Sequence, residues 1–142
     1  MIYKKTWKYI LCKDNTCYLG KYKSYYRPKA LKDFSDVTNG DLGGFITSYH
    51  NLSQKGDCWI YNYATITRNA IVSENAKVYN NAVVTNNAKV FGNAKVYDNT
   101  VISDNAKIFD DAQIFDNVRV LGNSQVKNNN RIHGTLIIDY DI

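Results

Sequence analysis

An aliphatic residue recurs at every sixth position over more than half of this chain. From residue 60 to residue 138 each of these positions holds isoleucine or valine, without a slip. Two positions earlier lies a small residue, usually alanine, and directly before it stands an asparagine in nearly every repeat. A period of six fits neither the 3.6-residue turn of a helix nor a coiled-coil heptad, and frequent asparagine weakens helices. The repeat therefore points to a repetitive β structure.

Each six-residue unit has the chemistry of one short strand followed by one turn. A β-branched residue suits a buried strand. The small and aliphatic residues are two apart, so alternation places both on the inner side of the strand. Asparagine tolerates a left-handed backbone, so we expect it to occupy the sharp turn. Three units would close one coil of about 18 residues and bring equivalent residues of successive coils into contact.

The aliphatic–x–x–Asn–small–x unit resembles the hexapeptide repeat of the acyltransferase superfamily. The resemblance implies a left-handed triangular prism. We therefore expect an all-β fold: a left-handed parallel β-helix of about five triangular coils over residues 44–142, with the strict repeat over 58–139. Fold alone does not imply function.

Residues 1–43 carry no repeat and are expected to cap the open end of the β-helix, where unpaired strands would otherwise invite aggregation. We predict a hairpin with strands at 2–12 and 17–26 and a turn at 13–16, followed by a short helix at 30–34. Turn-forming residues at 39–44 mark the start of the coil. Ile46, Leu52 and Ile60 would form the core of an irregular first coil, with a two-residue insertion within 54–57.

Charge and cysteine content restrict the partners and the compartment. Residues 1–57 carry ten Lys/Arg and five Asp/Glu (net +5), whereas residues 58–142 carry eight of each (net zero). The basic segment is either a solvated surface or a site for a polyanion. With neither a membrane-spanning run nor a secretory signal, we expect a cytoplasmic protein. Cys58 falls in a core slot; a disulfide between Cys12 and Cys17 is an alternative that a reducing cytosol disfavours.

The residues flanking each buried aliphatic point outward and sort onto three faces. The first face alternates aromatic and basic side chains, which either stack to stabilise the sheet, dock a protein, or stack nucleic-acid bases or a nucleotide. Its candidate binding residues are Trp59, Tyr61, Lys77, Tyr79, Lys95, Tyr97, Phe115 and Arg131. The second face is uncharged and β-branched and is the candidate for a homodimer or trimer contact. Its residues are Val83, Thr85, Val101, Ser103, Leu121 and Ile137.

Catalytic equipment is sparse. The resemblance to hexapeptide acyltransferases implies a histidine base, and the chain has only His50 and His133. His50 is expected to pack or cap within the first coil. His133 is the only catalytic candidate, and the sequence offers it no obvious orienting carboxylate. The repeat holds no long loop in which a pocket could be built, and no metal cluster or cofactor motif is present, so no cofactor is expected.

Residues 40–46, 51–53, Gly56 and Trp59 resemble the first coil of small repeat proteins encoded by phages and prophages, often labelled transferases. That resemblance implies a phage origin. The leading hypothesis is thus a non-enzymatic protein that engages a host protein or protein complex, for instance to inhibit a host-defence system as anti-CRISPR proteins do. The alternatives are an acyltransferase-like enzyme and a binder of nucleic acid or nucleotides.

Overall fold

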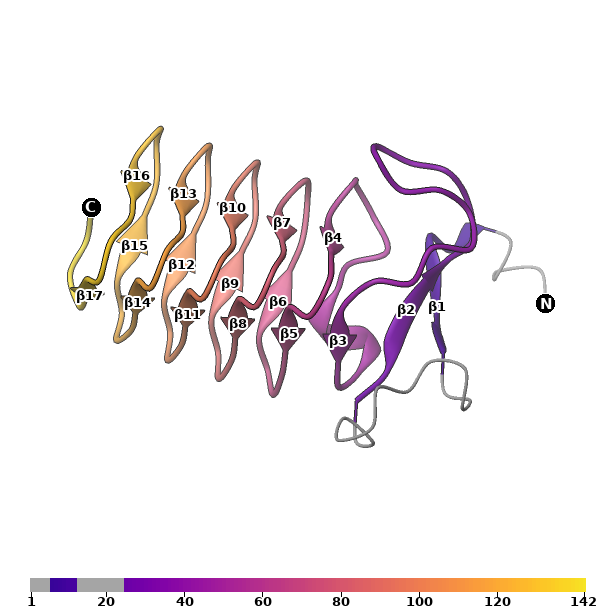
Figure 1. Ribbon diagram of the computed structural model, residues 1–142, viewed down its shortest axis with the longest axis horizontal. Helices are drawn as coiled ribbons and strands as arrows, with labels where there is room; N and C mark the ends of the chain where they lie inside the picture. Colours follow the sequence, from indigo (N-terminus) through magenta and orange to yellow (C-terminus); the bar gives the residue numbers. More distant parts are fainter. Residues whose placement is uncertain (1–5, 13–24) are drawn as a thin grey trace.

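The computed structural model describes residues 6–12 and 25–142, and these residues form a coil of short parallel strands capped by a hairpin (Figure 1). Nearly all strands of the coil are two residues long and stack into three sheets of six, five and four strands. The aromatic sheet contains β4 (Trp59–Ile60), β7 (Lys77–Val78), β10 (Lys95–Val96), β13 (Gln113–Ile114) and β16 (Arg131–Ile132). The uncharged sheet contains β3 (Phe45–Ile46), β5 (Thr65–Ile66), β8 (Val83–Val84), β11 (Val101–Ile102), β14 (Arg119–Val120) and β17 (Ile137–Ile138). The third sheet contains β6 (Ile71–Val72), β9 (Lys89–Val90), β12 (Lys107–Ile108) and β15 (Gln125–Val126).

The core is a column of equivalent layers. Val78, Val96 and Ile114 pair in register along the aromatic sheet. Nearly all the aliphatic residues of the repeat are fully buried, as are the alanines of the small slots. Burying β-branched side chains against one another removes apolar surface from water at each coil. The predicted parallel β-helix is confirmed.

The turns correct one expectation. The left-handed backbone falls on the residue before the repeated asparagine, as at Arg68 (φ 56°), Asn80 (φ 57°) and Asp104 (φ 57°). The repeated asparagine instead continues the ladder between coils: the Asn69 N–H donates to the Asn86 carbonyl at 2.9 Å. The sequence alone did not separate the two positions, because asparagine also occurs at the left-handed one, where other coils have aspartate or glycine.

The irregular first coil is confirmed. Ile46 pairs with Ile66 and Leu52 with Val72, each 20 positions apart, whereas Ile60 pairs with Val78, 18 positions apart. The two extra residues therefore lie between Leu52 and Ile60, as the sequence predicts. A 3-10 helix, η4 (Tyr49–Asn51), replaces one ordinary turn.

The cap is a hairpin, but its second strand differs from the expected one. β1 (Tyr9–Cys12) pairs antiparallel with β2 (Arg27–Ala30). The sequence predicted the second strand at 17–26, and residues 17–24 of that range lie outside the described residues. It also predicted a helix at 30–34, where the chain instead bends into a turn closed by a bridge between Phe34 and Val37. β2 is held on its other side by the start of the coil, because Gly43 donates to the Pro28 carbonyl at 2.7 Å and Tyr26 bonds Ile46. At the start of the expected helix, the Ala30 N–H donates to the Asp41 carbonyl and the Leu31 N–H to the Lys8 carbonyl, each at 2.8 Å, so this backbone is bonded to other segments instead of within a helix.

A buried lysine fastens the cap to the coil. Lys8 is fully buried, and its Nζ donates to the carbonyls of Cys58 at 2.7 Å and Gly56 at 3.2 Å. Burial lowers the pKa of Lys8 and raises the pKa of the Cys58 thiol, which lies 3.2 Å from the amine. Cys12 is disulfide-bonded, contrary to the expectation of reduced thiols, and Cys17 lies outside the described residues.

Over the ranges 6–12 and 25–142, no helix has the length and apolar character needed to cross a membrane.

Candidate functional site

The aromatic sheet carries a ladder of stacked rings on its outer surface. Each ring belongs to the residue that follows a buried aliphatic, so the coil repeat sets the spacing. Tyr79 and Tyr97 stack with centroids 4.6 Å apart and planes within 4° of parallel, and Tyr97 stacks on Phe115 at 5.0 Å. The His133 ring continues the stack 5.1 Å beyond Phe115. We call Tyr61, Tyr79, Tyr97, Phe115 and His133 the ring ladder.

Trp59 does not belong to this surface. It is only 1% exposed, because the cap covers β4. Its ring meets Phe34 edge-on at 5.3 Å and Tyr9 at 6.1 Å. Its assignment as a binding residue is therefore wrong: Trp59 belongs to the contact between cap and coil.

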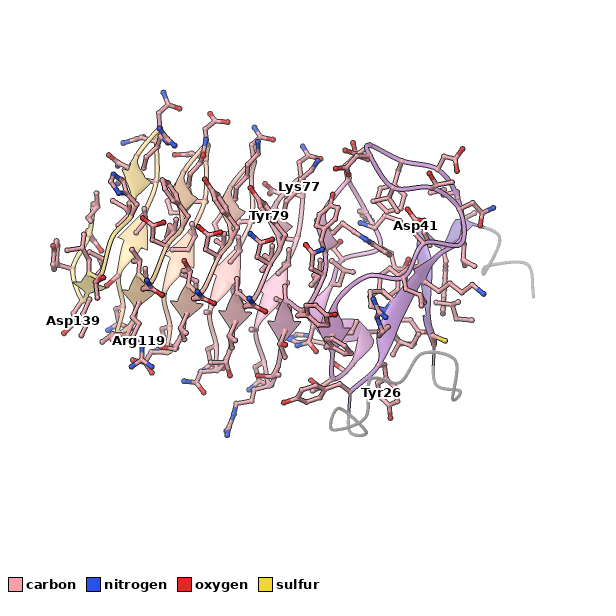
Figure 2. The ribbon with its side chains drawn as sticks, in the orientation of Figure 1. Tyr26, Asp41, Lys77, Tyr79, Arg119 and Asp139 are labelled. Carbon is pink, nitrogen blue, oxygen red and sulfur yellow. The ribbon has the colours of Figure 1, made fainter. Side chains whose placement is uncertain are left out.

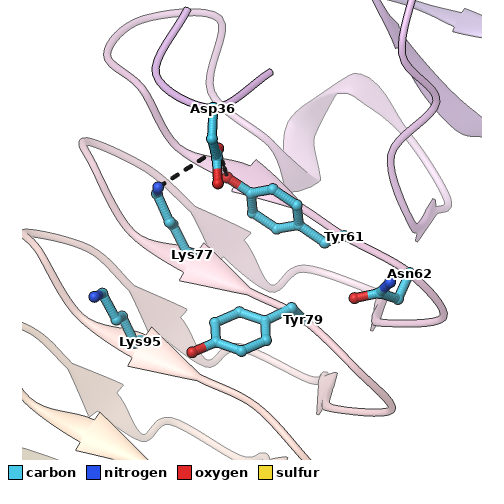
Figure 3. Close-up of a pocket in the computed structure, with 6 residues that line it drawn as sticks. All are labelled: Asp36, Tyr61, Asn62, Lys77, Tyr79 and Lys95. Carbon is cyan, nitrogen blue, oxygen red and sulfur yellow. Dashed lines mark hydrogen bonds and ion pairs between the residues drawn. The ribbon is translucent and has the colours of Figure 1, made fainter. Parts of the chain in front are cut away.

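The ladder changes direction where it meets the cap. The Tyr61 ring stands at 85° to Tyr79, with centroids 6.2 Å apart. The Tyr61 hydroxyl donates to Asp36 Oδ1 at 2.6 Å, and Lys77 Nζ lies 3.6 Å from the same oxygen (Figure 3). Asp36 belongs to the cap, so the cap supplies an acid to a face on which the repeat places only bases.

The electrostatics of this junction follow from these contacts. The hydrogen bond from Tyr61 and the charge of Lys77 lower the pKa of Asp36. Burial, followed by the bond to Asp36, raises the pKa of Tyr61 far above its ordinary value. Burial raises the pKa of Tyr79 to about 12. Both phenols are therefore neutral hydrogen-bonding groups near pH 7.

A shallow cavity of about 270 Å³ opens at the bend in the ladder. It is lined by Asp36, Tyr61, Asn62, Lys77, Tyr79 and Lys95 (Figure 3). Lys77 also approaches the Tyr61 ring at 5.9 Å and the Ser35 hydroxyl at 3.2 Å, whereas the Lys95 side chain is exposed. The cavity thus combines one cation held by the cap with one turned to solvent.

Further along the same face, Arg131 lies 5.2 Å from the Phe115 centroid. The structure therefore brings seven of the eight predicted binding residues to one surface and excludes Trp59. The corner beside the rings is acidic: Asp98 accepts a hydrogen bond from the Asp116 N–H at 3.1 Å. Both aspartates accept hydrogen bonds from backbone N–H groups of the next coil.

His133 has a carboxylate partner that the sequence did not suggest. Its Nδ1 lies 3.6 Å from Asp116 Oδ2, an oxygen that also accepts the Gly134 N–H at 2.9 Å. The turn after β13, in the preceding coil, therefore places a carboxylate within ion-pair distance of His133, although no hydrogen bond joins the two side chains. His133 is exposed and does not line the cavity at Tyr61. His50 is also exposed, in η4, rather than packed inward.

The six residues of the predicted oligomer face lie together on the uncharged sheet. Val83 pairs in register with Val101, and the hydroxyls of Thr67 and Thr85 lie 2.8 Å apart. Figure 2 shows this side, marked by Arg119 and Asp139, turned away from the side that carries Lys77 and Tyr79. Ile137 is 65% exposed.

Two features were missed at the sequence level. Asp36 lies in an irregular turn with no periodic signal. Phe91 and Phe109 stack at 5.0 Å on the third sheet, forming a second, shorter ring pair, and the six-residue period does place them 18 positions apart. Among the described residues, no group of three or more His, Cys, Asp or Glu side chains could hold a metal ion.

Part of the coil is similar in sequence to known proteins. A family model described as the YdcK beta-solenoid repeat matches residues 112–128, which include β13, β14 and β15. Over 49 residues, 34% of the chain, the sequence is 41% identical to a protein of Escherichia coli (strain K12) named "Uncharacterized acetyltransferase YdcK". The match spans only 15% of that relative's length.

Proposed function

We propose that this hexapeptide-repeat β-helix protein is a non-catalytic binding module that docks a protein partner on its ring ladder. The observation that supports the proposal is the ladder itself. Tyr79, Tyr97 and Phe115 are stacked at 4.6 and 5.0 Å and flanked by Lys95 and Arg131. Aromatic and arginine side chains supply most hot spots in protein interfaces.

The ladder is fixed before any partner arrives. Each ring is held between its neighbours and springs from a strand whose backbone is bonded to the next coil. Little side-chain entropy is therefore lost on docking, which favours affinity. The cavity at Tyr61 provides a recess in which one partner side chain could anchor, with Lys95 available to a carboxylate at its rim.

The same geometry gives less support to a nucleic-acid or nucleotide binder. Parallel rings about 5 Å apart cover one another's faces, so they present edges outward. Base stacking needs a free ring face. The acidic corner at Asp98 and Asp116 would also repel phosphates.

The proposed partner is a host protein or protein complex. The resemblance to phage-encoded repeat proteins suggests a specific version of this function, the inhibition of a host-defence complex. The test is affinity purification from the native host with wild-type protein and with Tyr79→Ala/Tyr97→Ala. We expect a defined partner to be recovered at least tenfold less with the double variant. Phe91→Ala/Phe109→Ala removes a ring pair of the same geometry from the third sheet and is the matched control.

If Tyr79→Ala/Tyr97→Ala recovers as much partner as the wild type, the assignment of the ring ladder is contradicted. If both double variants lose the partner to the same extent, the loss reflects a general effect of removing stacked rings, and this outcome also counts against a specific docking face. Far-UV circular dichroism on each variant verifies that the coil remains folded.

A second candidate function, acyl transfer, has one supporting observation: the contact between His133 and Asp116. A carboxylate that orients a histidine is a common arrangement for a general base, and the similar E. coli protein carries an acetyltransferase label. Calorimetric titration with acetyl-CoA tests it. Binding that is clear in wild type and retained in His133→Ala, with acetyl transfer lost only in the variant, would support catalysis; absence of binding would exclude it.

A further inference from the structure

The uncharged sheet differs from the other two in the absence of lysine. Lys77 and Lys95 open strands β7 and β10 of the aromatic sheet, and Lys89 and Lys107 open β9 and β12 of the third sheet. The equivalent positions of the uncharged sheet hold Thr65, Val83 and Val101. The second outward positions of the same strands hold Thr67, Thr85 and Ser103, so three successive rungs present no charge.

These rungs form a flat, regular surface. Thr65, Val83 and Val101 follow one another in register across β5, β8 and β11. The bond between the Thr67 and Thr85 hydroxyls, at 2.8 Å, leaves fewer hydroxyl groups in need of water along the second column. The cap covers the strand before them, where Phe45 is 1% exposed, so the open face begins at β5.

A face of this composition suits a second copy of the same chain. In a two-fold interface each surface meets itself, so a cation near the axis meets its own copy. Pairing through the aromatic sheet would oppose Lys77 and Lys95 to lysines, and pairing through the third sheet would do the same with Lys89 and Lys107. Like charges brought together at an interface cost several kcal/mol. Only the uncharged sheet escapes this penalty.

We propose that two copies pair through the uncharged sheet about a two-fold axis that passes between β8 and β11. In this arrangement Val83 of one copy lies opposite Val101 of the second. The charged residues of the sheet, Arg119 and Asp139, fall outside the centre, where interfaces are polar and solvated. The face is distinct from the ring ladder, so pairing leaves the proposed docking surface open.

The size of the contact face sets the expected affinity of the dimer. Across this axis β8 lies opposite β11 and β5 opposite β14, whereas β17 would face β3, which the cap covers; four strands spaced about 4.8 Å apart therefore make a contact about 14 Å long. That is at the small end of specific interfaces. We therefore expect a dimer that dissociates on dilution, with a dissociation constant in the micromolar range.

Sedimentation equilibrium over a hundredfold range of concentration tests the pairing. Wild-type protein is expected to pass from monomer to dimer, and Val101→Lys to remain monomeric throughout. Gln113→Lys, which adds the same charge at the equivalent position of the aromatic sheet, is the control and should dimerise as wild type does. Circular dichroism of each variant confirms that a monomer is a folded one.

A charge-pair variant tests the position of the axis. Val83→Glu alone should be monomeric, but Val83→Glu/Val101→Lys should recover the dimer, because glutamate and lysine then face each other across the axis. A wild-type monomer at the highest concentration, or a Val101→Lys variant that still dimerises, would overturn the proposal. So would a trimer, since a two-fold axis cannot generate one.

Discussion

At the scale of single residues, the corners of the prism are held by side chains that reach from one coil to the next. Asp104 Oδ2 accepts the Gly122 N–H at 2.9 Å, and Asp110 Oδ2 accepts the Asn128 N–H at 3.0 Å. The acceptor and donor residues both have a left-handed backbone. A short polar side chain at this position thus tolerates the turn and satisfies a backbone donor of the next coil.

Asp104→Ala tests this role. Alanine removes the acceptor for Gly122 N–H and lacks a side chain that favours the left-handed backbone, so we expect a loss of about 1–2 kcal/mol in the free energy of unfolding. Urea denaturation monitored by circular dichroism measures it. Asp104→Asn keeps an acceptor oxygen and should lose less; an equal loss in both variants would argue that the charge, rather than the hydrogen bond, matters.

Thr100 offers a change of opposite sign. It occupies a small inward slot that other coils fill with alanine, and its buried hydroxyl has no hydrogen-bond partner among the described residues. An unsatisfied buried hydroxyl costs about 1–3 kcal/mol. We expect Thr100→Val, which keeps the shape, to raise the free energy of unfolding by about 1 kcal/mol.

Ser124 provides the contrast for that measurement. It fills the same kind of slot, but its hydroxyl donates to the Leu121 carbonyl at 2.7 Å. Ser124→Ala should therefore lower the stability by about 1 kcal/mol or leave it nearly unchanged. A destabilised Thr100→Val would mean that the threonine hydroxyl finds a partner in solution.

At the scale of elements, the cap and the coil differ in how far the sequence predicts them. The coil repeats one local unit, so thirteen aliphatic positions after Ile60 predict one another and the sorting of residues onto faces follows. The cap depends on contacts made once. Lys8 reaches Cys58 and Asp36 reaches Tyr61, positions 50 and 25 residues apart, and no period links them. For the same reason the sequence could not show that Trp59 is covered or that β2 begins at Arg27.

Acid should weaken the contact between cap and coil. The Tyr61 hydrogen bond and Lys77 hold the pKa of Asp36 below its ordinary value of 3.8 in the folded protein. The contribution of Asp36 is therefore complete above the unfolded pKa and is lost as the pH falls through the lower, folded pKa. We expect tryptophan fluorescence, to which the buried Trp59 contributes, to report this change as the pH falls below the ordinary carboxyl pKa of 3.8.

Asp36→Asn provides the control. Without a titrating carboxylate at this site, the variant should have a looser cap at pH 7 and a smaller change on acidification than the wild type. An unchanged acid transition would show that other carboxylates dominate it.

At the scale of the whole molecule, the coil is nearly one-dimensional, since each rung contacts only those above and below it (Figure 1). Stability in such proteins is close to a sum over repeats and their interfaces. The three faces of the coil can then vary independently in sequence, because changes of outward side chains leave the core unchanged. Uncharged residues follow one face, and rings with lysines follow the other two, without disturbing the layers beneath.

Removal of one complete coil tests this independence. Deletion of residues 83–100 joins Ala82 to Val101, preserves the small–x–aliphatic spacing and places β13 directly on β7. The spacing of 18 between stacked residues, as at Asn69 and Asn87, is kept across the junction. We expect a folded protein with a single cooperative thermal transition at a lower temperature and a smaller m-value in urea, because less surface is buried.

Deletion of residues 83–99, which removes one residue fewer, is the control, because it would turn the inward side chains of the following strand outward. That variant should lose the cooperative transition of the C-terminal coils; if both deletions unfold alike, the layers are not interchangeable and the one-dimensional description is wrong.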